Sequence, residues 1–310
     1  MIVEEVSPAL VDKISQLGSF IGNTPLFEIK NLVQKPGVQI FAKLEWQQFS
    51  GSVKARPAYQ ITKDAVLRGE LTPGKTLLDA SSGNTAIAYA AIGAAAGIPV
   101  TICLPENASE ERKQILRAYG AEIISTSKFG TTDEAQERAR ELYDNDPEKY
   151  FYADQYNNEN NWKAHYNYTA PEILKQTNQE ITHFVAGLGT TGTFTGTSKR
   201  LKKEVPNVKT VALQPDEALH GLEGWKHLET AQVPGIFNAD LIDKTIQVNT
   251  YEALSLLPEI SKNEGLLVSP SSTANLLGAL EIARQIDKGV IVTVFPDNAE
   301  KYSEVLKSIF

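Results

Sequence analysis

Short apolar strands alternate with helices along most of this chain, and this alternation constrains the fold more than any other feature. Strands are expected at 39–45, 76–79, 100–104, 122–125, 183–186, 208–214, 245–248 and 290–295. Helices are expected at 53–68, 84–96, 160–176, 192–205, 251–263, 272–286 and 299–309. Short apolar strands separated by helices are typical of parallel sheets covered on both faces. We therefore predict an α/β protein with two doubly wound, mostly parallel sheets and helices on both faces of each.

Length and composition favour two domains. A chain of 310 residues with 42% hydrophobic residues can bury a large core, and chains of this size usually divide. We expect a smaller inserted domain at 46–148 and a larger one built from 1–45 and 149–310. The functional site is expected in the cleft between the two domains.

The charge of the chain limits its partners. A formal charge of −8 and an isoelectric point near 5.2 argue against nucleic acid or an anionic membrane as a partner. An anionic ligand would therefore need local donors. Cys103 is the only cysteine, so no intrachain disulfide can form, which fits a cytoplasmic protein.

Lys54 lies in the stretch 50–57, which follows the first predicted strand and opens a helix. Pro57 is tolerated only near the first turn, so the helix begins no earlier than about Val53. Small residues at 50–52 are expected to supply N-cap oxygens. Lys54 then sits at the positive end of the helix dipole, a position that suits a neutral amine or an imine. A lone lysine at a helix start is more often a solvated side chain.

Residues 80–85 read Ala-Ser-Ser-Gly-Asn-Thr and lie between a strand and an Ala-rich helix. Hydroxyl, amide and backbone donors at a helix N-terminus are suited to bind a carboxylate. A simple capping turn would favour the same residue types, so this stretch alone leaves both interpretations open.

Residues 187–193 read Gly-Leu-Gly-Thr-Thr-Gly-Thr, again between a strand and a helix. Glycines allow the backbone amides to wrap an anion, and a phosphate is the natural occupant. The stretch also matches G-x-G-x-x-G, so a nicotinamide-dependent dehydrogenase is a rival interpretation. That rival requires an acidic residue at the end of the next strand, which ends at Gln214 with Asp216 just beyond.

Together, these motifs resemble the pyridoxal-phosphate enzymes of fold type II, which are tryptophan synthase β-like. The match is with the cysteine synthase and cystathionine β-synthase group, and most of all with its bacterial O-acetylserine or O-phosphoserine sulfhydrylases. The motifs that carry the resemblance lie at 21–26, 52–54, 81–85, 189–193 and 265–272, in the family's order.

The resemblance implies a role for each candidate residue. Lys54 would bind pyridoxal 5′-phosphate as the internal aldimine and, once displaced by substrate, would remove the α-proton. Asn84 would hydrogen-bond the cofactor's 3′-oxygen, and Ser271 would meet its pyridine nitrogen. The cofactor's phosphate would be held by Gly189, Thr190, Thr191, Gly192 and Thr193. The substrate carboxylate would be bound by Ser81, Ser82, Gly83, Thr85 and Gln155.

The implied reaction is β-replacement on an activated serine, O-acetyl-L-serine or O-phospho-L-serine, through an aminoacrylate. A hydroxyl at Ser271 makes the cofactor a mild electron sink, which favours elimination over transamination. Sulfide or another sulfur donor would then give L-cysteine. A cystathionine β-synthase-like or other β-replacement or elimination enzyme, and a catalytically idle relative, are the alternatives. The resemblance also implies a homodimer, and no metal.

Three positions bear on these roles. Ala55 and Ala86 stand where the family usually has Asp and Gly, and Asp297 stands where many relatives have a serine near the ring. If the Asp297 carboxylate reached the pyridine nitrogen, the mild-sink argument would weaken.

Lys226 is a candidate to bind a phosphate leaving group, and the alternative is an ion pair with Glu223.

Overall fold

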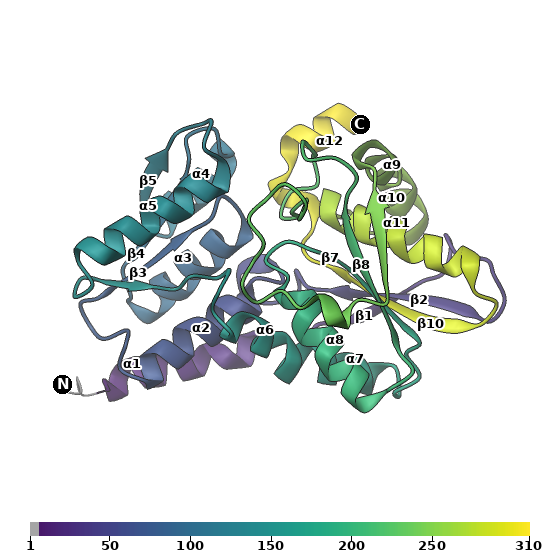
Figure 1. Cartoon of the computed structure of the whole chain (residues 1–310), viewed down its shortest axis with the longest axis horizontal. Helices are drawn as coiled ribbons and strands as arrows, with labels where there is room; N and C mark the ends of the chain where they lie inside the picture. The colour runs from purple at the N-terminus through teal and green to yellow at the C-terminus, as the bar shows by residue number, and fades with distance from the viewer. Residues whose placement is uncertain (1–5) are drawn as a thin grey trace. The chain divides into compact units, whose positions relative to one another are not determined.

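The computed structural model describes residues 6–310, apart from the side chain at position 131, and divides them into two compact units. The first unit contains the described residues up to Ile21 together with Lys54–Asn161, and the second contains Gly22–Val53 and Trp162–Phe310. The expected domain limits at 46 and 148 therefore lie near, but not at, the residues where the units divide. Each unit has its own sheet covered by helices, which confirms the α/β prediction (Figure 1).

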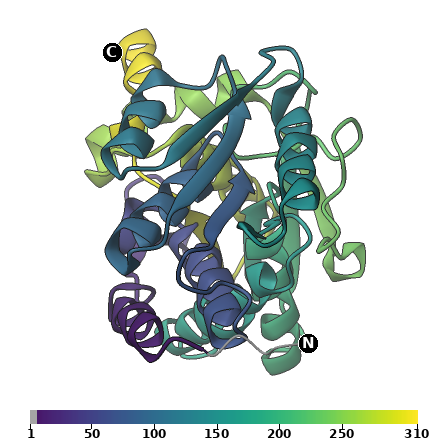
Figure 2. The same ribbon diagram turned by 90° about the vertical axis from the view of Figure 1, so that its left-hand side faces the viewer.

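The first unit is built on a four-stranded sheet of order β5-β4-β3-β6, in which all neighbours are parallel. Its strands are β3 (Thr76–Ala80), β4 (Val100–Pro105), β5 (Glu122–Thr126) and β6 (Tyr150–Tyr152). β3 and β4 are buried along their whole length, as expected for strands covered on both faces. Figure 2 faces this unit and shows its blue strands among the surrounding helices.

Five α-helices accompany this sheet: α1 (Pro8–Leu17), α2 (Ala55–Leu67), α3 (Asn84–Ala96), α4 (Glu110–Ala118) and α5 (Thr131–Asn145). Leu78 and Ala80 of β3 pack against Ala135 and Ala139 of α5. Because side chains alternate along a strand, Asp79 points to the opposite face. Helix α3 also packs on β3, and α1 and α2 pack against α3 in turn.

The second unit is built on a six-stranded sheet of order β1-β2-β10-β7-β8-β9. Its strands are β1 (Leu26–Ile29), β2 (Val38–Leu44), β7 (His183–Gly187), β8 (Lys209–Pro215), β9 (Lys244–Val248) and β10 (Gly289–Phe295). Only β1, at the edge, runs antiparallel to its neighbour. The carboxyl ends of the parallel strands therefore share one edge, where the loops that follow β7 and β10 begin.

Helices cover both faces of the larger sheet. They are α6 (Asn160–Ala164, which begins at the end of the first unit), α7 (Ala170–Gln176), α8 (Gly192–Glu204), α9 (Thr250–Ser255), α10 (Leu257–Glu264), α11 (Pro270–Gln285) and α12 (Ser303–Ile309). Phe184 and Val292 pack with α7 and α8, whereas Val185 and Ile291 pack with α11. Figure 1 shows these two helical layers on opposite sides of the sheet.

Three predictions at the level of elements were wrong. The helix expected at 160–176 contains a π-helical stretch, His165–Thr169, between α6 and α7, and the helix expected at 251–263 divides into α9 and α10. The short strands β1 and β6 were not foreseen. Further, the N-cap residue of α2 is Lys54, whose side chain makes no capping hydrogen bond.

Among the described helices, none combines the length and the apolar character needed to cross a membrane. The same part of the chain holds no cluster of three or more His, Cys, Asp or Glu side chains arranged to bind a metal ion.

Candidate functional site

The predicted site residues fall into two groups, one in each compact unit. Lys54, the loop 81–85 and Gln155 belong to the first unit, and the loop 189–193, Ser271 and Lys226 belong to the second. Lys54 is half-buried and is the N-cap residue of α2, with its carbonyl accepting the Ala58 amide at 3.1 Å. It therefore lies at the positive end of that helix, as its position in the sequence predicts.

The loop after β3 contains both buried and accessible polar groups. Ser81 is buried, and its Oγ accepts the amides of Gly83 at 3.2 Å and Ala86 at 3.3 Å, so it caps the start of α3. Ser82, Gly83 and Asn84 are partly exposed. The capping interpretation therefore describes Ser81 well, while the next three residues remain accessible to a ligand.

Gln155 joins this loop because β6 lies beside β3 in a parallel pair, so their carboxyl ends meet. Its Oε1 accepts the Thr85 hydroxyl at 2.7 Å, and its Nε2 donates to the Ala80 carbonyl at 2.9 Å. Asn161 holds the Gln155 carbonyl at 2.7 Å. Gln155 is 2% exposed, and its side-chain amide holds the loop. Nε2 carries a second N–H besides the one that donates to the Ala80 carbonyl.

The loop after β7 ends at the N-terminus of α8, where Thr191 is the N-cap residue. Thr191 has a φ of 67°, in the left-handed region, which is a genuine outlier for a β-branched residue. Its hydroxyl is buried and reaches no hydrogen-bond partner in the described chain. A strained residue with an unsatisfied hydroxyl at a helix N-terminus indicates that this loop is shaped to bind an anion.

Two glycines of this loop are required by close packing. A Cβ on Gly187 would lie 2.0 Å from the Trp225 indole, and one on Gly189 would lie 2.0 Å from the Gly224 carbonyl oxygen. The Lys226 amide also donates to the Leu188 carbonyl at 2.7 Å, which ties the two segments together. Lys226 itself is half-buried outside any helix, and its Nζ donates to the Gln232 carbonyl at 3.4 Å.

Ser271 lies in the first turn of α11, within a buried group of hydroxyls. Its Oγ is 3.1 Å from the Ser269 Oγ, and Ser269 in turn lies 2.9 Å from the Ser272 Oγ. Ser272 donates to the backbone carbonyl of Asp297 at 3.0 Å, whereas the Asp297 carboxylate accepts the Tyr302 hydroxyl at 2.8 Å. Ser271 is thus placed by its neighbours, with only 4% of its surface exposed.

Several supporting residues could not be found from the sequence. His165, in the π-helical stretch, contacts the Thr193 hydroxyl through Nε2 at 3.3 Å and Thr169 through Nδ1 at 2.9 Å. Asn275 of α11 accepts the Gly187 amide at 2.8 Å. Each lies far from its loop in sequence, so no motif pointed to it. Asp79 did carry a signal, because it is an acid inside an apolar strand.

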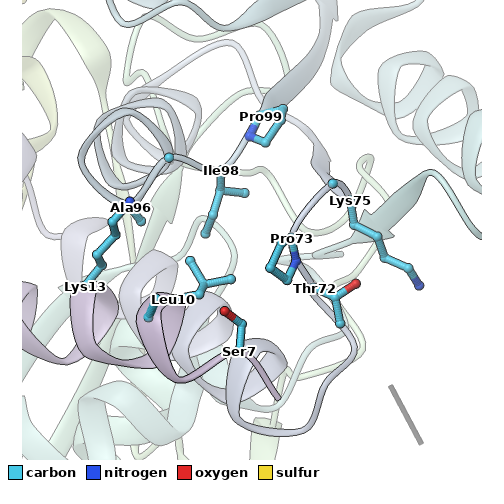
Figure 3. Close-up of a pocket in the computed structure, with 12 residues that line it drawn as sticks. Ser7, Leu10, Lys13, Thr72, Pro73, Lys75, Ala96, Ile98 and Pro99 are labelled. Carbon is cyan, nitrogen blue, oxygen red and sulfur yellow. The ribbon is translucent and has the colours of Figure 1, made fainter. Parts of the chain in front are cut away.

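A pocket of about 180 Å³ in the first unit contains none of these residues. It lies between α1, the 72–75 turn and the stretch 96–99, and Figure 3 shows Leu10 and Ile98 pointing toward one another within it. This pocket is at the amino ends of β3 and β4. Ligands of parallel sheets bind at the carboxyl ends, where the candidate loops are, so we do not assign the function to this pocket.

Comparison with known proteins is consistent with the two loops. Residues 17–297 match the family model for pyridoxal-phosphate-dependent enzymes. The chain is 47% identical to the cysteine synthase of Aquifex aeolicus, covering 91% of this chain and 88% of that protein. It is 38% identical to cysteine synthase B of Escherichia coli, covering 93% and 94%.

Its structure is also similar to the crystal structure of a cysteine synthase from Entamoeba histolytica. The TM-score is 0.88 and the identity is 30%, and the match covers 98% of this chain and 92% of the other. The chain belongs to the family of pyridoxal-phosphate-dependent enzymes, within its cysteine synthase group.

Proposed function

We propose that this protein is a cysteine synthase, which replaces the β-substituent of an activated L-serine with a sulfur nucleophile. The observation that carries this proposal is full-length similarity to cysteine synthases in a chain that retains Lys54 and both ligand-binding loops. The rival interpretation as a nicotinamide-dependent dehydrogenase is not compatible with the family to which the chain belongs.

The residues present fit pyridoxal phosphate. Thr191, with its buried hydroxyl and left-handed backbone at the start of α8, suits a phosphate group. We assign the phosphate to Gly189, Thr190, Thr191, Gly192 and Thr193. When bound, the cofactor supplies an electron sink for the electrons released at the substrate's Cα.

The other roles follow from the chemistry of the side chains. Lys54 would hold the cofactor through Nζ, and its amine would be the base that accepts the proton from the substrate's Cα. Asn84 would donate to the cofactor's 3′-oxygen, and Ser271 would meet the pyridine nitrogen with a hydroxyl that does not enforce its protonation. The substrate carboxylate is bound by Ser81, Ser82, Gly83, Thr85 and Gln155. In the last set, Ser81, Thr85 and Gln155 act mainly by holding the loop, because their side chains already bond within it.

For the leaving group we propose acetate, so that O-acetyl-L-serine is the donor and sulfide the simplest acceptor. Lys226 stays a candidate for binding the phosphate of O-phospho-L-serine, and the Discussion gives its test.

We also propose a cytoplasmic homodimer. Sedimentation of the purified protein tests the dimer, and a mass of one chain would contradict it.

The function is tested with the purified protein and O-acetyl-L-serine plus sulfide. We expect L-cysteine as product, and borohydride reduction followed by peptide mapping should place the pyridoxyl mass on Lys54. Lys54→Ala should lower turnover by about 10²–10⁴-fold or more, because it removes both the attachment and the base. Lys63→Ala is the control, because Lys63 is a half-buried lysine of the same helix with no proposed role in the site. If homocysteine replaces sulfide with higher efficiency and gives a product other than L-cysteine, the cystathionine β-synthase-like alternative is favoured. No turnover at all would favour the alternative of a catalytically idle relative.

A further inference from the structure

Asp79 is a fully buried acid that the proposed mechanism does not use. It is the fourth residue of β3, after Leu77 and Leu78, and its side chain is 0% exposed. A carboxyl group buried in an apolar strand costs stability unless it is hydrogen-bonded. Its Oδ1 accepts the Ala80 amide at 2.8 Å, whereas its Oδ2 reaches no partner in the described chain.

The contacts of Asp79 connect the two strands whose ends form the substrate loop. The nearby Gln155 amide and Tyr89 hydroxyl also lower the pKa of Asp79, against the larger effect of burial. Gln155 then returns to the loop, with Nε2 on the Ala80 carbonyl and Oε1 on Thr85. Asp79 therefore holds the Ala80 amide, and the Gln155 side chain bonds to the Ala80 carbonyl and the Thr85 hydroxyl of the same loop.

We propose that Asp79 is a positioning residue for the substrate: it keeps the loop 81–85 and Gln155 in the geometry that binds the substrate carboxylate. The inference rests on the role of that loop given under Proposed function. Asp79 is fully buried, so we place it out of contact with the substrate. Its removal should therefore weaken substrate binding more than it slows the chemistry.

The surroundings of Asp79 favour its uncharged form. Burial is the largest effect and raises the pKa of Asp79 to about 8, and the nearby charge of Asp154 acts in the same direction. The titratable and charged groups around it are Tyr89 on α3, Cys103 on β4, Tyr152 on β6, Asp154 and Tyr156 after β6, and Asp133, Arg138 and Arg140 on α5. Burial raises the pKa of both Cys103 and Tyr152, and Arg138 and Arg140, respectively, oppose that rise; neither arginine is among the groups that act on Asp79.

This protonation state has a consequence for binding. Below about pH 8, Asp79 is neutral, and the loop meets the substrate carboxylate without opposition. Above that pH, the new negative charge lies directly behind a loop that must bind a carboxylate, and like charges repel. The KM for the amino-acid donor should therefore rise through this pH range, because Asp79 becomes negatively charged.

The test compares the holoenzyme with Asp79→Asn and Asp79→Ala, and with Asp144→Asn at an exposed site as control. Asparagine keeps the acceptor toward Ala80 and cannot ionise, so it should retain the parent KM near neutral pH and lose the alkaline rise. Alanine leaves the Ala80 amide without its acceptor, and its donor KM should be about tenfold higher with a smaller change in kcat. The cofactor's absorbance, unchanged in each variant, shows that the fold is kept.

Infrared difference spectra on raising the pH provide a measurement that does not depend on turnover. The parent should lose the carbonyl band of a protonated carboxylic acid near pH 8, and Asp79→Asn should lack that band. An identical alkaline rise of KM in Asp79→Asn, or an unchanged KM in Asp79→Ala, would overturn the proposal. If the parent fails to turn over activated serines, the proposed function is wrong. In that case equilibrium binding of L-serine decides Asp79: weaker binding by Asp79→Ala supports its role, and equal binding refutes it.

Discussion

Thr191 offers a direct test of the idea that the loop after β7 is shaped for a ligand and not for stability. It combines a β-branched side chain, a φ of 67° and a buried hydroxyl without a partner in the described chain. Each of these features costs free energy in the protein without cofactor. Thr191→Gly removes all three at once, because glycine adopts positive φ readily and carries no hydroxyl.

The magnitude follows from the separate contributions. A sparsely populated backbone conformation costs about 1–3 kcal/mol, and an unsatisfied buried hydroxyl about another 1–3 kcal/mol. Against this, the variant loses about 0.8 kcal/mol for a buried methyl group and about 0.5–1 kcal/mol for the extra chain entropy of glycine. We therefore expect the apoprotein to gain about 0.2–4.7 kcal/mol in the free energy of unfolding, with a central value of about 2.5 kcal/mol.

The holoenzyme should respond in the opposite way. A hydrogen bond from a hydroxyl to a charged phosphate contributes about 1.5–3 kcal/mol, so the dissociation constant of the cofactor should rise about 10- to 150-fold. Denaturant unfolding of the apoprotein and titration with pyridoxal phosphate, followed by absorbance, measure the two effects separately.

Thr197→Gly is a matched control, because Thr197 lies on the same helix and also has a buried hydroxyl without a partner in the described chain. Its backbone is helical, so glycine there relieves no backbone strain and costs about 1 kcal/mol in helix propensity, and the apoprotein should gain less stability than it does from Thr191→Gly. The reasoning fails if Thr191→Gly and Thr197→Gly change the free energy of unfolding of the apoprotein equally, or if the affinity of Thr191→Gly for the cofactor equals that of the parent.

Two further predictions concern the cofactor ring and the leaving group of the substrate. Ser271→Asp should keep the cofactor but slow β-replacement by about tenfold or more, because a carboxylate would hold the pyridine nitrogen protonated; steady-state turnover measures this, and a parent-like rate would mean that Ser271 does not face the ring nitrogen. Lys226→Ala should lower kcat/KM for O-phospho-L-serine by about tenfold while sparing O-acetyl-L-serine if its ammonium binds the leaving phosphate; equal small losses for both donors would end that assignment.

Much of the fold could be predicted from local patterns. The strands that the sequence indicated are short apolar runs followed by helix starts, and burial on both faces produces such runs in parallel sheets. The strands β1 and β6 escaped notice for opposite reasons. β1 lies at an edge and is half-exposed, so its pattern is weak, while β6 has only three residues and becomes a strand through pairing with β3.

The π-helical stretch at His165–Thr169 could not be predicted because its cause lies in tertiary packing. A Cβ on Gly196 of α8 would lie 2.0 Å from the Trp162 carbonyl oxygen and 2.9 Å from the His165 Cβ. The two helices thus approach at a distance that only glycine permits. This approach brings the His165 ring to the Thr193 hydroxyl, and π-bulges of this kind often occur at functional sites.

Close packing requires the glycines at 187 and 189, and the sequence motif did not indicate this requirement. The sequence suggested that they free the backbone to wrap an anion, but their missing Cβ atoms make room for Trp225 and the Gly224 carbonyl. Trp225 is buried, and the adjacent Lys226 amide bonds to Leu188, so the loop is supported from behind by the segment 222–226. That support is what allows Thr191 to be held in a strained conformation, because a strained residue persists only where its surroundings determine the backbone. The same segment carries Lys226, so a shift of Trp225 would move the loop proposed to hold the cofactor and the side chain proposed to meet the leaving group together.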